Sequence, residues 1–372
     1  MAQTVLITGG AGFIGSHLAD VLLEHGYAVR VLDNLDTQVH GATGMRPDYL
    51  NPEAELLVGD VRDPETVRRA LKGVDAVYHL AALVGVGQSM YQAARYTDVN
   101  NIGTAVLLEA LSQNPVERLI VASSMSVYGE GRYVTGDGQP GLPAERTLAQ
   151  MKRGDWEVYD AQGQRLIPIA TDEQKIPALA SVYALSKYDQ ERLCLVMGKA
   201  YNIPTVALRF FNAYGTRQAL SNPYTGVLAI FASRFLNGRP PLITEDGCQR
   251  RDFVSVRDIA HACRLALTAP NAPGGVFNVG SGHPMSVLEV ADHMARALNC
   301  THIAPEITGK YRVGDIRHCF ADIRSAGEVL GYRPQVTLEE GLTELCAWLE
   351  GQNAVDHAED AQRELASRGL AV

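Results

Sequence analysis

TVLITGGAGFIGSHLADVLLEHGYAVRVLDN, residues 4–34, contains a complete β-α-β unit. The β-branched run 5–8 predicts a strand, and the apolar-periodic run 12–25 predicts a helix that Gly26 ends. A second apolar strand is predicted at 28–32. Because such a unit begins a doubly wound parallel sheet, we expect an α/β fold.

The turn of this unit carries glycines with G-x-x-G-x-x-G spacing, at Gly9, Gly12 and Gly15. Backbone without Cβ lets peptide N–H groups and a helix N-terminus approach a pyrophosphate. Asp33 ends the second strand, where a carboxylate can accept hydrogen bonds from an adenosine ribose. These features together predict a Rossmann-like dinucleotide site.

Asp33 also bears on which dinucleotide is bound. Its carboxylate repels a 2′-phosphate, and the residues that follow it, Asn34, Leu35 and Asp36, supply no cation to receive one. We therefore predict NAD rather than NADP, which argues against an NADPH-consuming reductase.

Three further predicted strands end in residues suited to a ligand site, because ligands bind at the carboxyl ends of parallel strands. The run 54–60 leads to Asp60 and Val61, which we expect near the adenine, and the run 75–82 ends in the small residues Ala81 and Ala82. The strand predicted at 118–122 is followed by Ser124 and other serines.

The segment SVYALSK, 181–187, places Tyr183 and Lys187 four residues apart in a run with helix-forming character. One helical turn separates them, so both side chains lie on one face. A surface helix could contain this pair by chance, and only the other motifs favour a catalytic interpretation.

The composition is that of an ordinary globular protein. A chain of 372 residues suggests two domains at about 150 residues per domain. A net charge of −9 gives no reason to expect nucleic acid or an anionic membrane as partner, and no apolar stretch is long enough to span a bilayer. The opening MAQTVLITGG reads as a strand rather than a signal peptide, and the six cysteines are scattered, so we expect a cytoplasmic protein without a metal site.

The motifs TGGAGFIG, SSMSVYG, YALSK, LRFFNAYG and RRDFVSVRDIA occur in an order that resembles the extended short-chain dehydrogenase/reductases, specifically the nucleotide-sugar epimerases and dehydratases. The resemblance covers residues 3–350. It implies an NAD-binding domain at 1–203 and a smaller, partly interleaved α/β domain for the nucleotide sugar at 204–350. It also implies a homodimer.

The resemblance implies a role for each matched residue. Tyr183 would be the base that takes the proton of a sugar hydroxyl, with Lys187 and the positive nicotinamide favouring its phenolate. Ser124 would bind the reacting oxygen. The expected cofactor contacts are Gly9, Gly12, Phe13, Ile14, Gly15, Asp33, Asn34, Asp60, Val61, Leu80, Ala81, Ala82, Asn100, Tyr183 and Lys187, and the expected substrate contacts are Ser126, Asn212, Arg251, Arg312 and Asp315.

Met125 and Ser126 bear on the reaction. Dehydrating relatives place an Asp-Glu pair after the hydroxyl residue, and decarboxylating relatives keep a glutamate there, whereas this chain has neither. We therefore expect a 4-epimerase that works through a transient 4-keto sugar. The chain most resembles the branch that converts dTDP-L-rhamnose to dTDP-6-deoxy-L-talose. A UDP-glucose or UDP-uronate 4-epimerase is the alternative, although Val84 stands where UDP-galactose 4-epimerases commonly have a lysine. An NAD-bound nucleotide-sugar binder without turnover is a further alternative.

Two segments depart from compact relatives. Residues 131–180 are an insertion between the serine strand and the tyrosine helix, which we expect to be a flap at the active-site mouth held down by Trp156, or else a surface decoration. Residues 351–372 are a polar, helix-prone tail to which the sequence assigns no function.

Overall fold

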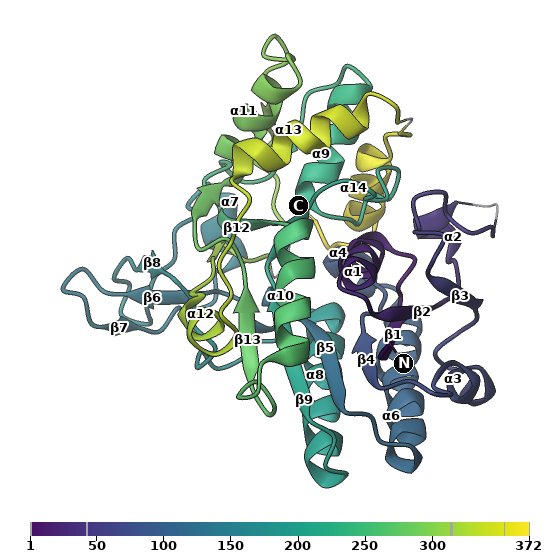
Figure 1. The fold of residues 1–372 in the computed structure, drawn as a ribbon. Helices are drawn as coiled ribbons and strands as arrows, with labels where there is room; N and C mark the ends of the chain where they lie inside the picture. The colour runs from purple at the N-terminus through teal and green to yellow at the C-terminus, as the bar shows by residue number, and fades with distance from the viewer. Residues whose placement is uncertain (1, 42–43, 313–314, 353, 372) are drawn as a thin grey trace.

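The computed structural model describes residues 2–41, 44–312, 315–352 and 354–371. Its centre is a seven-stranded parallel sheet in the order β13-β9-β5-β4-β1-β2-β3 (Figure 1). These strands are β1 (Thr4–Thr8), β2 (Ala28–Asp33), β3 (Glu55–Val58), β4 (Ala76–His79), β5 (Arg118–Ser124), β9 (Thr205–Phe210) and β13 (Val276–Val279). The predicted doubly wound α/β fold is confirmed.

Helices cover both faces of this sheet, which explains why its central strands are apolar on both sides. Val5, Leu6 and Ile7 of β1 are all completely buried. One face carries α1 (Phe13–Glu24), α10 (Val256–Thr268) and α12 (Arg324–Leu330), and the other carries α3 (Pro64–Ala70), α6 (Gly103–Gln113) and α8 (Val182–Ala200).

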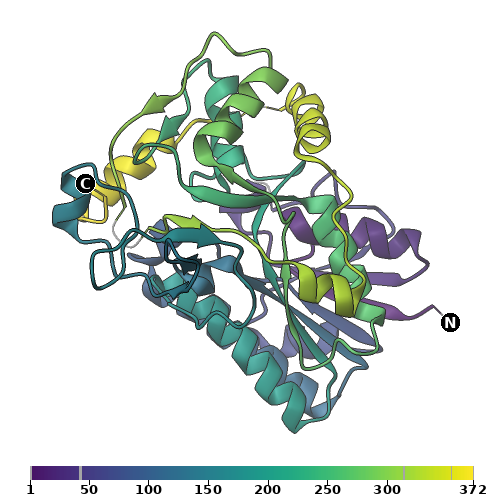
Figure 2. The ribbon, with the colours of Figure 1, turned by 90° about the vertical axis from the view of Figure 1, so that its left-hand side faces the viewer.

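The sheet takes two of its strands, β9 and β13, from beyond residue 203, so the two halves of the chain interleave. The remainder of the second half forms a smaller unit beside the carboxyl ends of the strands (Figure 2). It contains α9 (Val227–Leu236), α11 (Val287–Ala297) and α13 (Leu338–Leu349) around a short sheet of β10 (Asn212–Tyr214), β12 (Arg250–Ser255), β14 (Pro284–Ser286) and β16 (His318–Cys319), with the pair β11 (Leu242–Ile243) and β15 (Glu306–Ile307). Capping boxes begin α11, at Ser286 and Glu289, and α13, at Thr337 and Glu340.

The insertion, residues 131–180, is folded. It forms an antiparallel sheet of β6 (Arg132–Val134), β7 (Pro140–Gly141) and β8 (Ile167–Ile169). The short helix α7 (Leu148–Lys152) lies between β7 and β8 in the chain. The sheet projects from one side of the molecule (Figure 1). Tyr133, Val158 and Leu166 make a small core of their own. This core explains how the segment keeps its shape away from the main body.

Candidate active site

The three motif glycines are needed for different physical reasons. Gly9 has φ +69°, and a Cβ there would lie 2.9 Å from the backbone of Ala81. A Cβ on Gly15 would lie 2.5 Å from the Gly10 Cα. A Cβ on Gly12 would meet only the Gly9 carbonyl oxygen, at 3.4 Å, and would otherwise point into the cavity. The fold therefore requires Gly9 and Gly15, whereas Gly12 leaves open a cradle that fits a closely approaching pyrophosphate.

A cavity of about 1230 Å³ runs from this turn to the smaller unit. Every site residue expected from the sequence lines it, except Asn100: Gly9, Gly12, Phe13, Ile14, Gly15, Asp33, Asn34, Asp60, Val61, Leu80, Ala81, Ala82, Ser124, Ser126, Tyr183, Lys187, Asn212, Arg251, Arg312 and Asp315. The cavity thus joins the motifs of both halves of the chain.

Asn100 is completely buried and does not line the cavity. Its amide accepts from the Leu83 N–H at 2.7 Å and donates to the Leu83 carbonyl and to the Ser186 hydroxyl, at 3.1 and 2.9 Å. We therefore correct the expectation that Asn100 contacts the cofactor directly. Asn100 instead holds the turn after β4 against α8, because its hydrogen bonds are used within the protein.

At the end of β2 the Asp33 carboxylate accepts hydrogen bonds from the N–H groups of Ala11, at 3.0 Å, and Leu35, at 2.9 Å. The tertiary structure also brings two cations to this end of the cavity that the local sequence lacked. Arg95 pairs with Asp36 at 2.8 Å, and Arg62 pairs with Asp60 at 2.7 Å. Because both arginines are already paired with carboxylates, this end of the cavity remains suited to a ribose hydroxyl rather than a phosphate.

Tyr183 lies near the start of α8, where the Ser181 hydroxyl caps the helix by accepting from the Ala184 N–H at 3.0 Å. The Tyr183 N–H donates to the Ser89 hydroxyl at 3.0 Å, and its ring meets the Tyr96 ring edge-on, with centroids 6.5 Å apart. These contacts hold Tyr183 at the cavity, which Ser124 also lines.

Lys187 is buried, and its ammonium donates to the Gln190 side-chain oxygen at 2.7 Å. Gln190 in turn donates to the Thr104 hydroxyl at 2.9 Å and to the Ala81 carbonyl at 3.3 Å. Gln190 was not predicted, although it lies three residues from Lys187 on the same helical face, and this spacing is a usable signal. It orients the ammonium from within the protein.

The electrostatics of this pair differ from the expectation. Burial raises the pKa of Tyr183, and the hydrogen bond from Ser124 only partly opposes this shift. Burial also lowers the pKa of Lys187 to about 8. The protein's own groups therefore keep the phenol protonated, because desolvation disfavours the charged form of both side chains.

Ser124 ends β5 and caps a 3₁₀ turn over Met125–Tyr128, accepting from the Ser126 N–H at 3.2 Å. The two serine hydroxyls also lie 3.2 Å apart. Both face the cavity, and Met125 stands between them in the sequence. The turn thus supplies hydroxyl groups and no carboxylate.

The other end of the cavity carries the predicted substrate residues. Arg251 donates to the Arg317 carbonyl at 2.9 Å, and Arg312 pairs with Asp315 at 3.2 Å. Burial raises the pKa of Asp315, but Arg312 and Arg251 more than offset it, so the pKa lies below its ordinary value. The Asn212 amide donates to the Asp252 carbonyl at 3.0 Å. This end therefore presents two cations and an ionised carboxylate.

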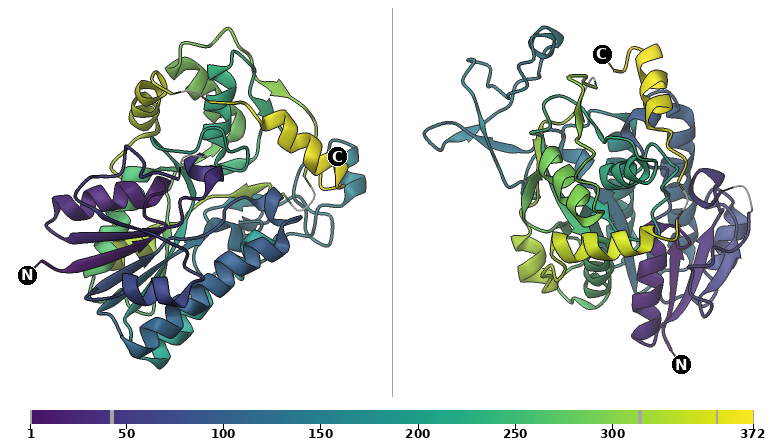
Figure 3. Two further views of the ribbon diagram at one scale, coloured as in Figure 1. Left: turned by 90° about the vertical axis from the view of Figure 1, so that its right-hand side faces the viewer. Right: turned by 90° about the horizontal axis from the view of Figure 1, so that it is seen from above.

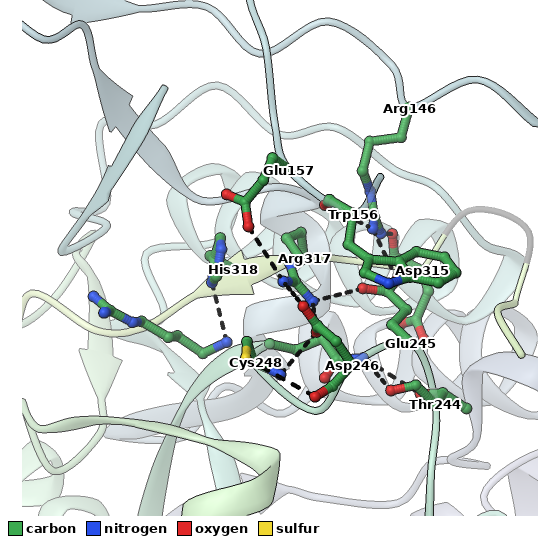
Figure 4. A network of polar contacts seen from close by, with 12 residues as sticks. Arg146, Trp156, Glu157, Thr244, Glu245, Asp246, Cys248, Asp315, Arg317 and His318 are labelled. Carbon is green, nitrogen blue, oxygen red and sulfur yellow. Dashed lines mark hydrogen bonds and ion pairs between the residues drawn. The ribbon is translucent and has the colours of Figure 1, made fainter. Parts of the chain in front are cut away.

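The insertion supports this end of the cavity from outside rather than covering it. Within 131–180 only Ala180 lines the cavity among the described residues. Trp156 instead packs against Tyr311, with ring centroids 5.9 Å apart. Arg146 donates to the Asp315 carbonyl at 2.8 Å (Figure 4). Trp156 therefore packs as expected, but its partner is Tyr311, which directly precedes the predicted substrate residue Arg312.

A buried ionic cluster joins the insertion to Glu245 and Arg317 (Figure 4). Glu245 is paired with Arg146 at 2.8 Å and with Arg317 at 2.9 Å. Arg317 is completely buried and also donates to both carboxylate oxygens of Asp246, at 2.6 and 2.9 Å. No sequence signal marked these residues, because their partners are far apart along the chain.

Comparison with known proteins gives concordant matches. A family model described as the NAD dependent epimerase/dehydratase family matches residues 5–150 and 156–280. A dTDP-L-rhamnose 4-epimerase from Burkholderia thailandensis is 36% identical over 353 residues, which cover 93% of this chain and 95% of that protein. A putative UDP-glucose 4-epimerase from Methanocaldococcus jannaschii is 32% identical and covers 94% and 99%.

Solved structures share the whole fold. A UDP-glucose 4-epimerase from Thermus thermophilus, in complex with NAD, has a TM-score of 0.74 at 32% identity and covers 94% of this chain and 100% of that one. A UDP-glucuronic acid 4-epimerase from Bacillus cereus, in complex with UDP-glucuronic acid and NAD, has a TM-score of 0.76 at 28% identity, with 94% and 99% covered. Within the described ranges, no helix combines the length and hydropathy that a membrane span requires.

Proposed function

The chain belongs to the NAD dependent epimerase/dehydratase family, and from this premise we propose that it inverts C4 of a nucleotide-diphosphate sugar, with dTDP-L-rhamnose as substrate and dTDP-6-deoxy-L-talose as product. The observation that carries the proposal is the convergence of Ser124, Tyr183 and Lys187 on one cavity with Arg251, Arg312 and Asp315. Redox groups at one end and phosphate-binding groups at the other suit a sugar held by its nucleotide.

The chain's own residues carry the proton transfers. Tyr183 takes the proton of the C4 hydroxyl as hydride leaves C4, which gives a 4-keto sugar. After the sugar turns over, hydride returns to the opposite face of C4, and Tyr183 gives the proton back. Ser124 would hydrogen-bond the C4 oxygen throughout, and Lys187 would hold the nicotinamide ribose when NAD is bound. NAD, when bound, supplies a positively charged ring and is the hydride acceptor and donor.

The raised pKa of Tyr183 explains why the positive charge of the nicotinamide ring would matter for proton transfer. Because burial keeps the Tyr183 phenol protonated, Tyr183 becomes a base only when a cation lowers its pKa. Proton removal is thereby confined to the complex in which hydride can also leave.

The turn after Ser124 favours epimerisation over elimination. Water loss needs an additional acid and base, and Met125 and Ser126 supply neither. The same turn argues against decarboxylation.

Two observations favour a 6-deoxy sugar. The relative from Burkholderia thailandensis is named for dTDP-L-rhamnose. In the turn after β4, Val84, Val86 and Met90 line the cavity with exposed apolar side chains, which suit a methyl group better than a carboxylate. UDP-glucose and UDP-uronate 4-epimerisation is the alternative, favoured by the solved structures of that activity.

We extend the proposal to a cytoplasmic homodimer. On α8, Leu185, Leu193 and Val196 remain exposed, and Ile102 is half exposed just before α6. Exposed apolar side chains on neighbouring helices favour association. Light scattering at the mass of one chain, 40.3 kDa, would contradict the dimer.

The activity is tested by incubating the protein with dTDP- and UDP-sugars without added cofactor and following the sugar C4 proton by NMR. We expect inversion with dTDP-L-rhamnose, and selective turnover of a UDP-sugar would instead support the alternative. Tyr183→Phe should bind NAD and lose turnover by a factor of about 10² to 10⁴. Full activity in this variant would remove Tyr183 as the base, and NAD binding without C4 inversion of any sugar by the unmodified protein would favour a binder without turnover.

A further inference from the structure

The C-terminal segment, residues 354–371, forms a wall of the cavity, although it lies outside both ranges that the family model matches. The sequence predicted a helix there, and α14 (Ala358–Ser367) is that helix. Figure 3 shows α14 beside the smaller unit and on the side of the carboxyl ends of the sheet strands. Ala361, Leu365 and Leu370 are among its residues that line the cavity.

The beginning of the segment is fixed to α9 by buried charge. Asp356 is almost completely buried and pairs with Arg234 at 3.1 Å and with Arg239 at 3.2 Å. The Asn237 amide also donates to the Ala354 carbonyl at 2.9 Å. Breaking such a pair leaves a buried charge without a partner, so the beginning of the segment is firmly attached to α9.

The middle of the segment reaches the other side of the cavity. Leu365 is buried, and its side chain lies so close to Gly87 that a Cβ there would be 3.1 Å from it. Gly87 belongs to the short helix α4 (Val86–Ser89), and Ser89 of that helix accepts the Tyr183 N–H. Leu365 therefore packs on the turn that positions the predicted base.

Two further contacts hold the returning chain. The Arg368 guanidinium lies over the Tyr91 ring, 4.4 Å from its centroid. Ala371 forms an antiparallel bridge with Arg312, a predicted phosphate ligand. The segment thus contacts both α4, which hydrogen-bonds the backbone of Tyr183, and Arg312 at the end of the cavity predicted to bind the nucleotide.

We propose that segment 354–371 is a wall of the cavity that positions the substrate. Leu365 is the residue of this wall that holds the sugar close to α4 and Tyr183. The inference rests on the proposed function, because a 4-keto sugar must turn over while its nucleotide stays bound. A wall attached to both ends of the cavity keeps the freed ring close to Tyr183. Leu365 offers apolar contact only, so the ring can rotate without breaking directional bonds.

Leu365→Asp tests the wall, and Ser367→Asp is its control, because Ser367 lies on the same helix but is exposed and does not line the cavity. Loss of the leucine contact should raise the KM for the nucleotide sugar by about tenfold or more. Because a wall holds substrate and transition state alike, kcat should stay within about twofold. The control should keep both constants, and Leu365→Ala replaces the aspartate variant if that one melts early. A lowered kcat at unchanged KM would overturn the proposal, since it would indicate a merely structural role.

Limited trypsin digestion gives a readout that needs no turnover. Arg363, in α14, and Arg324, in the distant α12, are both largely exposed. Addition of dTDP or UDP should slow cleavage after Arg363 and leave cleavage after Arg324 unchanged, because a ligand beneath the wall reduces its opening. Equal cleavage after Arg363 with and without either nucleotide would refute the wall. Protection in a protein that inverts no sugar would refute the proposed function alone.

Discussion

Replacement of Gly12 by alanine separates cofactor binding from folding. Gly12 has φ −75° and ψ −176°, a conformation open to any L-residue. Its new Cβ would meet one protein atom within 4 Å, at 3.4 Å, so the folded protein loses nothing. By restricting the unfolded chain, Gly12→Ala should raise the free energy of unfolding by about 0.4–1 kcal/mol. The same methyl enters the pyrophosphate cradle, where overpacking costs about 1–3 kcal/mol, so the Kd for NAD should rise by about 5- to 150-fold.

Gly15→Ala is the matched control. Its Cβ would lie 2.5 Å from the Gly10 Cα and the Gly9 carbonyl oxygen, so we expect a loss of stability of at least about 1–3 kcal/mol. Urea unfolding followed by circular dichroism measures stability, and isothermal titration measures the Kd for NAD. A Gly12→Ala protein that binds NAD like the unmodified one would refute the assignment of the cradle. One that unfolds as readily as Gly15→Ala would refute the packing argument.

Two further predictions concern buried charge. Because burial lowers the pKa of Lys187 from 10.5 to about 8, the unfolded chain binds one more proton between these values, and the free energy of unfolding should rise with pH across that window. Lys187→Met should lose this rise in urea titrations at pH 7 to 10, and parallel curves for the two proteins would contradict the shift. Arg317→Met leaves Glu245 short of one buried partner and should cost about 3–5 kcal/mol in urea unfolding. Arg324→Met, which removes an exposed arginine from its pair with Asp322, should cost no more than about 1 kcal/mol, and similar losses in both variants would contradict the argument from burial.

Features that depend on near neighbours were predictable. The strand at 5–8, the helix ended by Gly26 and the strand that ends at Asp33 follow from periodicity and turn chemistry within 34 residues. The position of Ser124 at the end of β5 followed from the rule that ligands bind at the carboxyl ends of parallel strands, whereas its convergence with Tyr183 of α8 was implied by the family resemblance.

Other features were set by partners distant in the sequence. Asn100 has the residue type of a ligand contact, but its amide is used by Leu83 and Ser186. The insertion was expected to be a flap at the active-site mouth, and instead it has its own core and supports Asp315 from outside the cavity through Arg146. The position of Leu365 on Gly87 joins residues 278 apart and had no local signal.

The sequence by itself determined the parallel fold, the dinucleotide turn and the pairing of Tyr183 with Lys187, because strand periodicity, glycine conformation and helical spacing act over a few residues. Only the tertiary structure decided which charges are satisfied and which groups close the cavity. Burial decides the direction of the Tyr183 pKa shift, and burial depends on atoms that packing brings together from the whole chain.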